Sequence, residues 1–378
     1  MIDCEQWNDA TAPVVMECWD PSKIPILTTL AQHFTLFDEW YASVPGPTYG
    51  NRMYFHAGTS DGTCHNVLPD GGFKIDTLYQ QLDEAGYDWG FYYDQTLDAS
   101  FFNYTRHPKF APRLRKLKVF GEDARAGTLP AVSFIMPHFY STEKVMADDQ
   151  HPNHAVSLGE ALIKNIYEEL RNSRSWNASA FLLTYDEHGG FYDHQPTPMK
   201  GIPNPDGKNC EATPGVPFDF QRLGLRVPTV LISPWVDHSV AHSPQGFKPQ
   251  PSSKFEHTSF IATLTRQLGL KGQMTKRTEW AAPFDYLFTR TTPRTDCPTH
   301  LPPVHQGLLE QYKLARRNAP EHLLPLDDLH ISYIQATNSM FGLPNNANLD
   351  QLKTEQDGAV YVESLMDAWH ARARTRSH

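Results

Sequence analysis

The sequence has no long hydrophobic run and no excess of basic residues. Its 378 residues contain no stretch of about 18 apolar residues, the length that a membrane-spanning helix needs, so any membrane contact must be peripheral. Lysine and arginine number 33 against 43 acidic residues, a net charge of −10. A protein that binds by neutralising phosphates needs the opposite balance, so a nucleic acid is not an expected partner.

Cysteine is scarce, and the beginning of the chain has no basic residues followed by an apolar stretch. The five cysteines are Cys4, Cys18, Cys64, Cys210 and Cys297. They form no C-x-x-C pair, so neither a disulfide framework nor a zinc ribbon is indicated, and reduced thiols are expected. Met1 is followed by Ile-Asp-Cys-Glu-Gln, so no secretory signal is visible. The expected location is therefore cytosolic or peripheral to a membrane.

Apolar residues make up 40% of the chain, which is enough for a packed core. Four short apolar runs are typical of strands buried on both faces: residues 87–93, 131–137, 180–185 and 227–233. Helical spacing marks residues 78–85, 158–170 and 258–268. The second helix is preceded by Ser157-Leu-Gly-Glu160, the pattern of a capping box, and lies between two strands, which predicts a βαβ unit with parallel strands. The predicted fold class is α/β, with a mainly parallel sheet flanked by helices.

The chain changes character near residue 292. Before that point, segments 195–218 and 239–253 have little periodicity and are predicted to be long loops, either functional or disordered. After it, prolines concentrate and helical patterns follow at 308–317, 326–340 and 361–372. We expect residues 1–291 to form the α/β core and residues 292–378 to form a helical C-terminal appendage.

The densest group of chemically active side chains follows the predicted strand 180–185. It contains Asp186, Glu187, Asp193 and His194. Ligands bind beyond the carboxyl ends of strands in an open parallel sheet, and carboxylates and imidazoles hold metal ions. A solvated turn has no need of this composition beside a buried strand. The cluster is therefore predicted to bind a metal ion or a phosphate.

Two other segments carry groups suited to a phosphate. His151 and His154 precede the predicted helix, where amides and the helix dipole favour an anion, although a histidine there can also be a simple cap.

In the second segment, residues 44–52, two prolines and two glycines fix a loop that offers the Thr48 hydroxyl, the Asn51 amide and the Arg52 guanidinium. Read alone, this loop fits a rigid turn as well as a site. A hydroxyl nucleophile needs a base or a metal ion to activate it, and the acids at Asp186 could hold such an ion.

In these motifs the chain resembles the phosphoesterase family of phosphatidylcholine-hydrolysing phospholipases C, particularly the plant-type non-specific phospholipases C, with acid phosphatases as relatives. Residues 48–52, Thr-Tyr-Gly-Asn-Arg, are similar to the family pattern Thr-x-Pro-Asn-Arg. Residues 186–194 are similar to Asp-Glu-x-x-Gly-x-x-Asp-His, and residues 224–228 to Gly-x-Arg-Val-Pro. Weaker matches include His151-Pro152 and Glu256-His257.

The resemblance implies an alkaline-phosphatase-like core that binds a divalent metal ion (Ca, Mg, Mn or Zn) and hydrolyses phosphate esters. The substrate would be a phospholipid, cleaved to diacylglycerol and a phosphorylated head group at the membrane surface. The implied catalytic residues are Thr48, as nucleophile, His151 and His194. The implied metal ligands are Asp186, Glu187 and the Thr48 oxygen. The implied phosphate-binding residues are Asn51, Arg52, Asp193 and His257.

The chain departs from the family pattern in three places. Gly50 stands where the family has Pro, and Ala155 where plant-type members have Asp. No Glu-Asn-Arg-Ser-Phe-Asp-His motif, which supplies two metal ligands in the family, precedes Thr48, and Glu5 and Asn8 are not adjacent.

The resemblance therefore predicts that the first strand of the sheet is missing, which leaves an unpaired strand edge, low solubility and weak activity. The alternatives are an impaired homologue that binds phosphorylated ligands or membrane surfaces without turnover, and an acid phosphatase that acts on monoesters.

Overall fold

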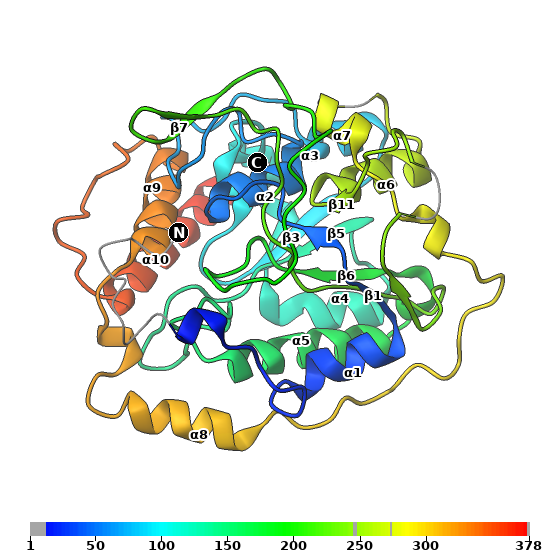
Figure 1. Ribbon diagram of the computed structural model, residues 1–378. Helices are drawn as coiled ribbons and strands as arrows, with labels where there is room; N and C mark the ends of the chain where they lie inside the picture. Colours follow the sequence, from blue (N-terminus) through cyan, green and yellow to red (C-terminus); the bar gives the residue numbers. More distant parts are fainter. Residues whose placement is uncertain (1–12, 245–247, 273, 376–378) are drawn as a thin grey trace.

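The computed structural model describes residues 13–244, 248–272 and 274–375, in which strands occupy the centre and helices pack around them (Figure 1). The strands are β1 (Thr35–Phe37), β2 (Trp40–Tyr41), β3 (Trp89–Tyr93), β4 (Leu114–Lys116), β5 (Val132–Ile135), β6 (Phe181–Thr184), β7 (Cys210–Thr213), β8 (Val216–Phe218), β9 (Thr229–Ile232), β10 (Ser239–Ala241) and β11 (Phe255–Glu256). The α-helices are α1 (Pro25–His33), α2 (Thr48–Ala57), α3 (Leu78–Glu84), α4 (Phe120–Ala126), α5 (Val156–Arg171), α6 (Thr258–Leu268), α7 (Lys276–Trp280), α8 (Gln306–Ala315), α9 (Asp328–Met340) and α10 (Glu355–Thr375). Short 3-10 helices include η3 (Asp98–Phe101) and η9 (Glu321–Leu323).

The larger sheets of the described chain are a four-stranded and a three-stranded one. The first has the order β10-β1-β9-β6, and the second has the order β4-β3-β5. Both pairs in the second sheet are parallel, as is the pair of β1 and β10, whereas β9 runs antiparallel to β1 and β6. Strands β2 and β11 form a further parallel pair, and β7 and β8 a hairpin. The α/β fold class is confirmed, with mixed pairing in the larger sheet.

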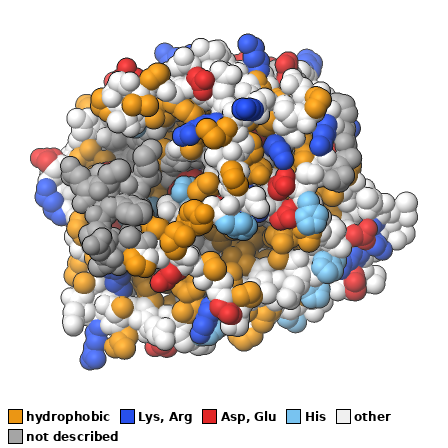
Figure 2. Space-filling model, viewed as in Figure 1, with side chains coloured by type: hydrophobic (Ala, Val, Ile, Leu, Met, Phe, Trp, Pro, Cys, Tyr) orange, Lys and Arg blue, Asp and Glu red, His pale blue; other side chains and the backbone are white. Residues whose placement is uncertain are grey.

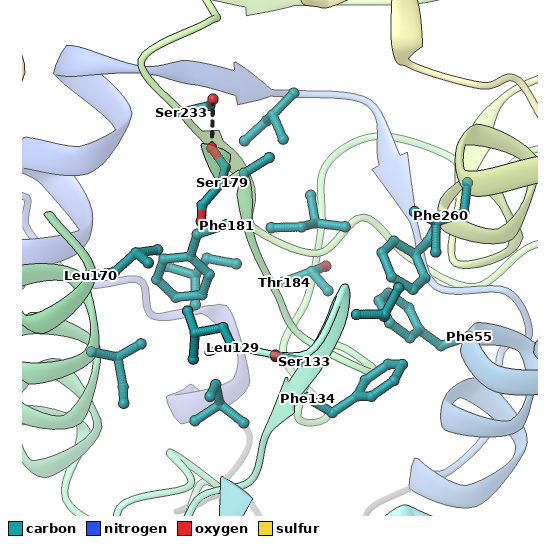
Figure 3. A pocket seen from close by; sticks show the side chains of 18 of the residues that line it. Phe55, Leu129, Ser133, Phe134, Leu170, Ser179, Phe181, Thr184, Ser233 and Phe260 are labelled. Carbon is teal, nitrogen blue, oxygen red and sulfur yellow. Dashed lines mark hydrogen bonds between the residues drawn. The ribbon is translucent and has the colours of Figure 1, made fainter. Parts of the chain in front are cut away.

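The four predicted strands are confirmed as β3, β5, β6 and β9, but β5 and β6 do not pair with each other. They belong to different sheets, and each is the last strand of its sheet in the described residues. Every open sheet has two end strands, so this arrangement does not test the expected missing strand, which stays a prediction. Strands β5 and β6 line a cavity of about 930 Å³, into which Phe134, Phe181 and Thr184 project (Figure 3).

Helix termini follow local sequence signals in two cases. Helix α6 begins and ends at the predicted residues, and Gly269 terminates it with a φ of 64°, a left-handed conformation that glycine adopts without strain. Helix α3 begins with a capping box made by Thr77 and Gln80. Both termini therefore depend on residues within a few positions of each other.

The predicted capping box at Ser157–Glu160 is wrong. Helix α5 begins at Val156, and its N-cap residue makes no side-chain hydrogen bond. The buried Glu160 carboxylate instead accepts hydrogen bonds from the amides of Ile26 and Leu27, both at 2.8 Å. These amides lie in the first turn of α1 and have no partner within their own helix, so a carboxylate on the neighbouring helix satisfies both groups.

The C-terminal helices α9 and α10 share a hydrophobic core with the N-terminal half of the chain. Tyr333 and Ile334 of α9 and Met366 of α10 belong to the same buried cluster as Tyr49 and Phe101. Helix α8 has no buried residue and lies at the periphery (Figure 1). A helical C-terminal region is confirmed, while the division into domains at residues 291 and 292 stays a prediction.

The two predicted loops contain short strands. Segment 195–218 includes the β7–β8 hairpin, and segment 239–253 begins with β10. The expectation of reduced thiols is wrong for one pair, because Cys64 and Cys210 form a disulfide. The two cysteines are 146 residues apart in the sequence, so their spacing gave no sign of the pairing, which arises when the hairpin folds back towards the loop after α2. No described helix has the length and the hydropathy that crossing a bilayer requires.

Candidate active site

The N-terminus of helix α2 presents Thr48. Pro47 is the N-cap residue, and Thr48 is the first residue of the helix. The Asn51 side chain fixes the preceding loop, since its Oδ1 accepts a hydrogen bond from the Val44 amide at 3.0 Å and its Nδ2 donates to the Gly46 carbonyl at 2.9 Å. The Thr48 hydroxyl makes no hydrogen bond with a described residue. The loop therefore holds a free hydroxyl at a helix N-terminus, where the dipole favours negative charge.

Arg52, one turn further along α2, joins two carboxylates. Its Nε donates to Asp186 Oδ2 at 2.9 Å, and its Nη1 lies 3.3 Å from Asp98 Oδ2. The guanidinium also packs 5.1 Å from the centre of the Phe139 ring. Nη2 donates to no described residue, so it can contact a further anion. The structure thus brings together Arg52 and Asp186, which come from motifs 134 residues apart.

Asp98 is a member of this network that the sequence analysis missed. It lies in η3 and is 3% exposed. His56 Nε2 and the Tyr333 hydroxyl are 3.1 Å and 2.9 Å from its carboxylate oxygens. Burial raises the pKa of Asp98, but Arg52 and His56 together lower it below its ordinary value. A lone aspartate outside any motif gave no signal, although His56 lies four residues after Arg52, on the same face of α2.

Asp186 and Glu187 follow strand β6 directly and form a pair of adjacent carboxylates. Asp186 Oδ1 accepts a hydrogen bond from the Glu187 amide at 3.1 Å, and Glu187 Oε2 accepts one from the Gly189 amide at 2.7 Å. Burial and the charge of Asp186 raise the pKa of Glu187. Two carboxylates that repel each other are a suitable donor set for a hard divalent cation, so these residues fit a metal ion.

The turn after Glu187 depends on glycine. Gly189 and Gly190 have φ values of 65° and 81°, which other residues rarely adopt. A Cβ atom on Gly189 would lie 3.0 Å from Pro152 Cγ, so this turn packs against the loop that carries His151. His151 Nδ1 is 2.5 Å from Asn153 Oδ1. The His151 loop and the acidic turn are therefore neighbours.

His257 positions the backbone of Asp186. The Trp40 Nε1–H group donates to His257 Nδ1 at 3.3 Å, and His257 Nε2 in turn donates to the Asp186 carbonyl at 2.7 Å. Burial lowers the pKa of His257, which favours this neutral tautomer. Both ring nitrogens therefore have protein partners.

Asp193 and His194 lie at the edge of this region. Asp193 forms a bidentate pair with Arg226, at 2.7 and 2.8 Å, which connects the acidic motif to the Gly-x-Arg-Val-Pro motif. The His194 side chain is 75% exposed, and its Nδ1 lies 3.6 Å from Asp193 Oδ1. The structure therefore gives Asp193 an arginine partner and leaves the His194 ring in solvent.

Some of the site residues line the cavity between β5 and β6, whereas Thr48, Glu187 and His151 are not among its lining residues. Asn51, Arg52, Asp98, Asp186 and His257 supply polar groups there, and most of the remaining lining is apolar. On the face of the molecule that Figure 2 shows, hydrophobic side chains surround a hollow, with acidic and histidine side chains at its rim. Of these groups the Arg52 guanidinium suits a phosphate oxygen directly, and the carboxylate pair suits a divalent cation that would in turn bind a phosphate.

Comparison with known proteins gives the family. The phosphoesterase family matches residues 3–271. Non-specific phospholipase C1 of Arabidopsis thaliana is 39% identical over 371 residues, which cover 96% of this chain and 68% of that protein. The chain therefore belongs to the phosphoesterase family.

Two further similarities are more distant. The hemolytic phospholipase C of Pseudomonas aeruginosa is 28% identical over 324 residues, which cover 70% of this chain and 41% of that protein. A solved structure of a protein in the alkaline phosphatase superfamily from Vibrio parahaemolyticus has a TM-score of 0.42 and 14% identity, and the match covers 68% of this chain and 63% of that one.

Proposed function

We propose that the protein hydrolyses phosphate esters as a phospholipase C, releasing diacylglycerol and a phosphorylated head group. The observation that carries the proposal is the contact between Arg52 and Asp186, which places the Thr48 helix beside the acidic pair. Membership of the phosphoesterase family and similarity to non-specific phospholipase C1 support this class of reaction. The phospholipid would meet the site from a membrane surface, as a peripheral contact.

In the proposed first step, Thr48 Oγ attacks the phosphorus atom, and the bond between phosphorus and the diacylglycerol oxygen breaks. Arg52 binds a non-bridging oxygen, with its Asn51 neighbour keeping the loop in place. A histidine gives its proton to the leaving diacylglycerol oxygen and is reprotonated by the proton that the Thr48 hydroxyl loses. His151 and His194 are the two candidates for this acid, and the packing of the His151 loop against the acidic turn favours His151.

In the second step, water attacks phosphothreonine, the bond from phosphorus to Thr48 Oγ breaks, and the phosphorylated head group leaves. Asp186, Glu187 and Thr48 Oγ would hold a divalent ion. When bound, such an ion lowers the pKa of a coordinated hydroxyl and offsets charge on the phosphate. Asp193 and His257 act as positioning residues. Asp193 pairs with Arg226, and His257 holds the backbone of Asp186.

The experiment compares phosphatidylcholine hydrolysis by the parent, Thr48→Ala and the matched control Thr128→Ala, whose residue is exposed just after the end of α4. We expect Thr48→Ala to lose activity by about a thousandfold or more with an unchanged circular dichroism spectrum, because no other hydroxyl replaces the nucleophile. Mass spectrometry of a quenched reaction should find phosphate on Thr48. Parental activity in Thr48→Ala would contradict the proposed mechanism.

A second candidate is a homologue that binds phosphorylated ligands without turnover. The observation in its favour is that both Asp186 oxygens already have protein partners, Arg52 and the Glu187 amide. Binding of phosphatidylcholine vesicles without release of diacylglycerol would support it. Turnover of p-nitrophenyl phosphate without turnover of phosphatidylcholine would instead indicate a monoesterase.

The disulfide gives information about the cellular compartment of the protein. Disulfides form and persist in oxidising compartments, so Cys64–Cys210 favours a location outside the reducing cytosol. Thiol labelling of protein taken from its native tissue tests this, since an oxidised pair would leave both cysteines unlabelled until a reductant is added.

A further inference from the structure

A second group of titratable side chains lies between the core and the C-terminal helices. It consists of His154, just before α5, Glu321 in η9, His330 in α9 and Glu355 at the start of α10. We call these four residues the buried His–Glu cluster. Their side chains are 2% exposed or less. The cluster shares no residue with the proposed active site.

Three buried atoms in this cluster have no hydrogen-bond partner among the described residues: His154 Nε2, Glu321 Oε2 and Glu355 Oε1. His154 Nε2 is 3.7 Å from Glu355 Oε1 and 3.8 Å from the nearer Glu321 oxygen, Oε1. Both distances are too long for a hydrogen bond. A buried polar atom without a partner costs stability, so three of them at one place indicate a missing ligand.

The opposite ends of these side chains are held by the protein. His154 Nδ1 is 2.6 Å from Asp149 Oδ1, and Glu355 Oε2 accepts a hydrogen bond from the Ser141 amide at 2.8 Å. An Nδ1–H bond to a carboxylate leaves the Nε2 lone pair of His154 directed at Glu355. In metal sites, ligand histidines are oriented by such a carboxylate.

The spacing of the unpartnered atoms suits a metal ion. Two donors on a tetrahedral zinc ion at about 2.1 Å lie about 3.4 Å apart, close to the 3.7 Å between His154 Nε2 and Glu355 Oε1. His154, His330 and Glu355 each offer one ligand atom, and these three atoms lie within 4.8 Å of one another. Both His330 nitrogens have other partners, however: Nε2 donates to the Phe139 carbonyl at 2.7 Å, and Nδ1 lies 2.8 Å from Asp327 Oδ1. His154 and Glu355 are therefore the primary pair.

We propose that the buried His–Glu cluster binds one divalent transition-metal ion of the zinc class, through His154 Nε2 and the Glu355 carboxylate, with Glu321 as the third protein ligand. Imidazole and carboxylate together select such ions over calcium or magnesium. Because the ligands come from the loop before α5, from η9 and from α10, the ion connects the C-terminal region to the core. Its role is structural, and it does not depend on the proposed hydrolysis.

A proton is the alternative occupant. Burial lowers the pKa of His154, but Asp149 and Glu355 raise it more strongly, to about 10. A protonated His154 would neutralise part of the same negative charge without any metal. The two occupants differ in metal content and in their response to added zinc.

The experiment measures zinc in the protein produced with ZnCl₂ in the medium and then dialysed against a weak chelator. The Asp186→Asn/Glu187→Gln double variant excludes ions at the proposed active site. We expect this variant to retain about one zinc per chain, released only when guanidinium unfolds it in the presence of a chromophoric chelator. Replacing zinc with cobalt should give the visible absorption of a tetrahedral site. No retained metal would overturn the proposal.

Glu355→Gln in the same background removes a ligand and keeps an oxygen for the Ser141 amide. We expect zinc affinity to fall at least tenfold and the zinc-dependent rise in unfolding temperature to disappear, whereas Glu310→Gln, an exposed control on α8, changes neither. Unchanged affinity in Glu355→Gln would overturn the proposal. If Glu355→Gln does not fold, Asp149→Asn serves instead, since it keeps every ligand but weakens the orientation of His154. It should lower zinc affinity about tenfold, and an unchanged affinity would equally contradict the site.

Discussion

Two buried polar clusters in this protein differ in how their charges are balanced. Around Arg52, a guanidinium joins Asp186 and Asp98, and Asp98 is further bonded to His56 and Tyr333. Around His154, carboxylates face an imidazole at 3.7 and 3.8 Å, and three atoms have no partner among the described residues. In the first cluster every carboxylate oxygen has a protein donor, and the group left over is Arg52 Nη2, a donor that suits an anion. In the second cluster the groups left over are mainly acceptors, which suit a cation. The comparison shows that the type of the unpartnered group indicates the charge of the ligand.

Removing Asp98 should produce the largest loss of stability, because it breaks the first of these clusters. Asp98→Ala leaves the buried Arg52 charge with one carboxylate and leaves the Tyr333 hydroxyl without its partner. We expect the free energy of unfolding to fall by about 3–5 kcal/mol. Urea unfolding measures the change, with Asp70→Ala, an exposed aspartate, as the control. A loss as small as that of the control would show that the network contributes little to the fold.

Opening the disulfide should have the next largest effect. Cys64→Ser/Cys210→Ser removes a covalent link that spans 146 residues, so the unfolded chain gains conformational freedom. The expected cost is about 2–4 kcal/mol in the same urea assay. Cys18→Ser, which replaces an exposed free cysteine, should be neutral. Equal midpoints for the double variant and the parent would contradict the expectation.

Neutralising Glu187 should change stability and metal binding in opposite directions. The folded-state pKa of this carboxyl is raised above 4.5, so its ionisation destabilises the metal-free fold as the pH rises above that value. Glu187→Gln should therefore be slightly more stable than the parent at pH 7 and equal to it near pH 4, yet bind divalent ions more weakly. Thermal unfolding and calorimetry measure the two effects, with the exposed Glu84→Gln as control. Unchanged metal affinity would remove Glu187 from the proposed ligand set.

Replacing His138 should give the smallest effect, which is a change in how the free energy of unfolding depends on pH. Burial lowers the pKa of His138, but Asp148 and Asp94 raise it more, to about 10. Because the folded pKa exceeds the ordinary 6.5, this interaction is fully present below pH 6.5 and is lost as the pH rises to about 10. His138→Gln should therefore flatten the decline of stability across that window, and the exposed His300→Gln should not. A parallel decline in parent and His138→Gln would show that other groups cause it.

The sequence was most informative where a structural signal is local. The apolar runs that became β3, β5, β6 and β9, and helix α6 with its terminal glycine, follow from side-chain periodicity and from the conformational freedom of glycine. The motif at Asp186 also stood out, because its composition has no use in a plain turn, whereas the Thr48 loop by itself fitted a rigid turn equally well. These signals depend on neighbours within a few residues.

Long-range partners could not be predicted in the same way. Glu160 looked like the end of a capping box but bonds the amides of α1, because those donors become available only when the two helices pack. Cys64 and Cys210 pair across 146 residues, and Asp98 joins Arg52 without belonging to any motif. Each of these contacts requires the folded chain.

The sequence by itself determined the α/β class, the family motifs and the chemical types at the proposed active site, since composition and local spacing carry that information. Only the tertiary structure decided that β5 and β6 stand in separate sheets beside a shared cavity, that Asp193 is held by Arg226, and that His154 meets Glu355. The physical reason is that each strand, charged group or buried polar group can pair with many others in the chain. Which pairs form depends on the packing of the core and on the exclusion of water.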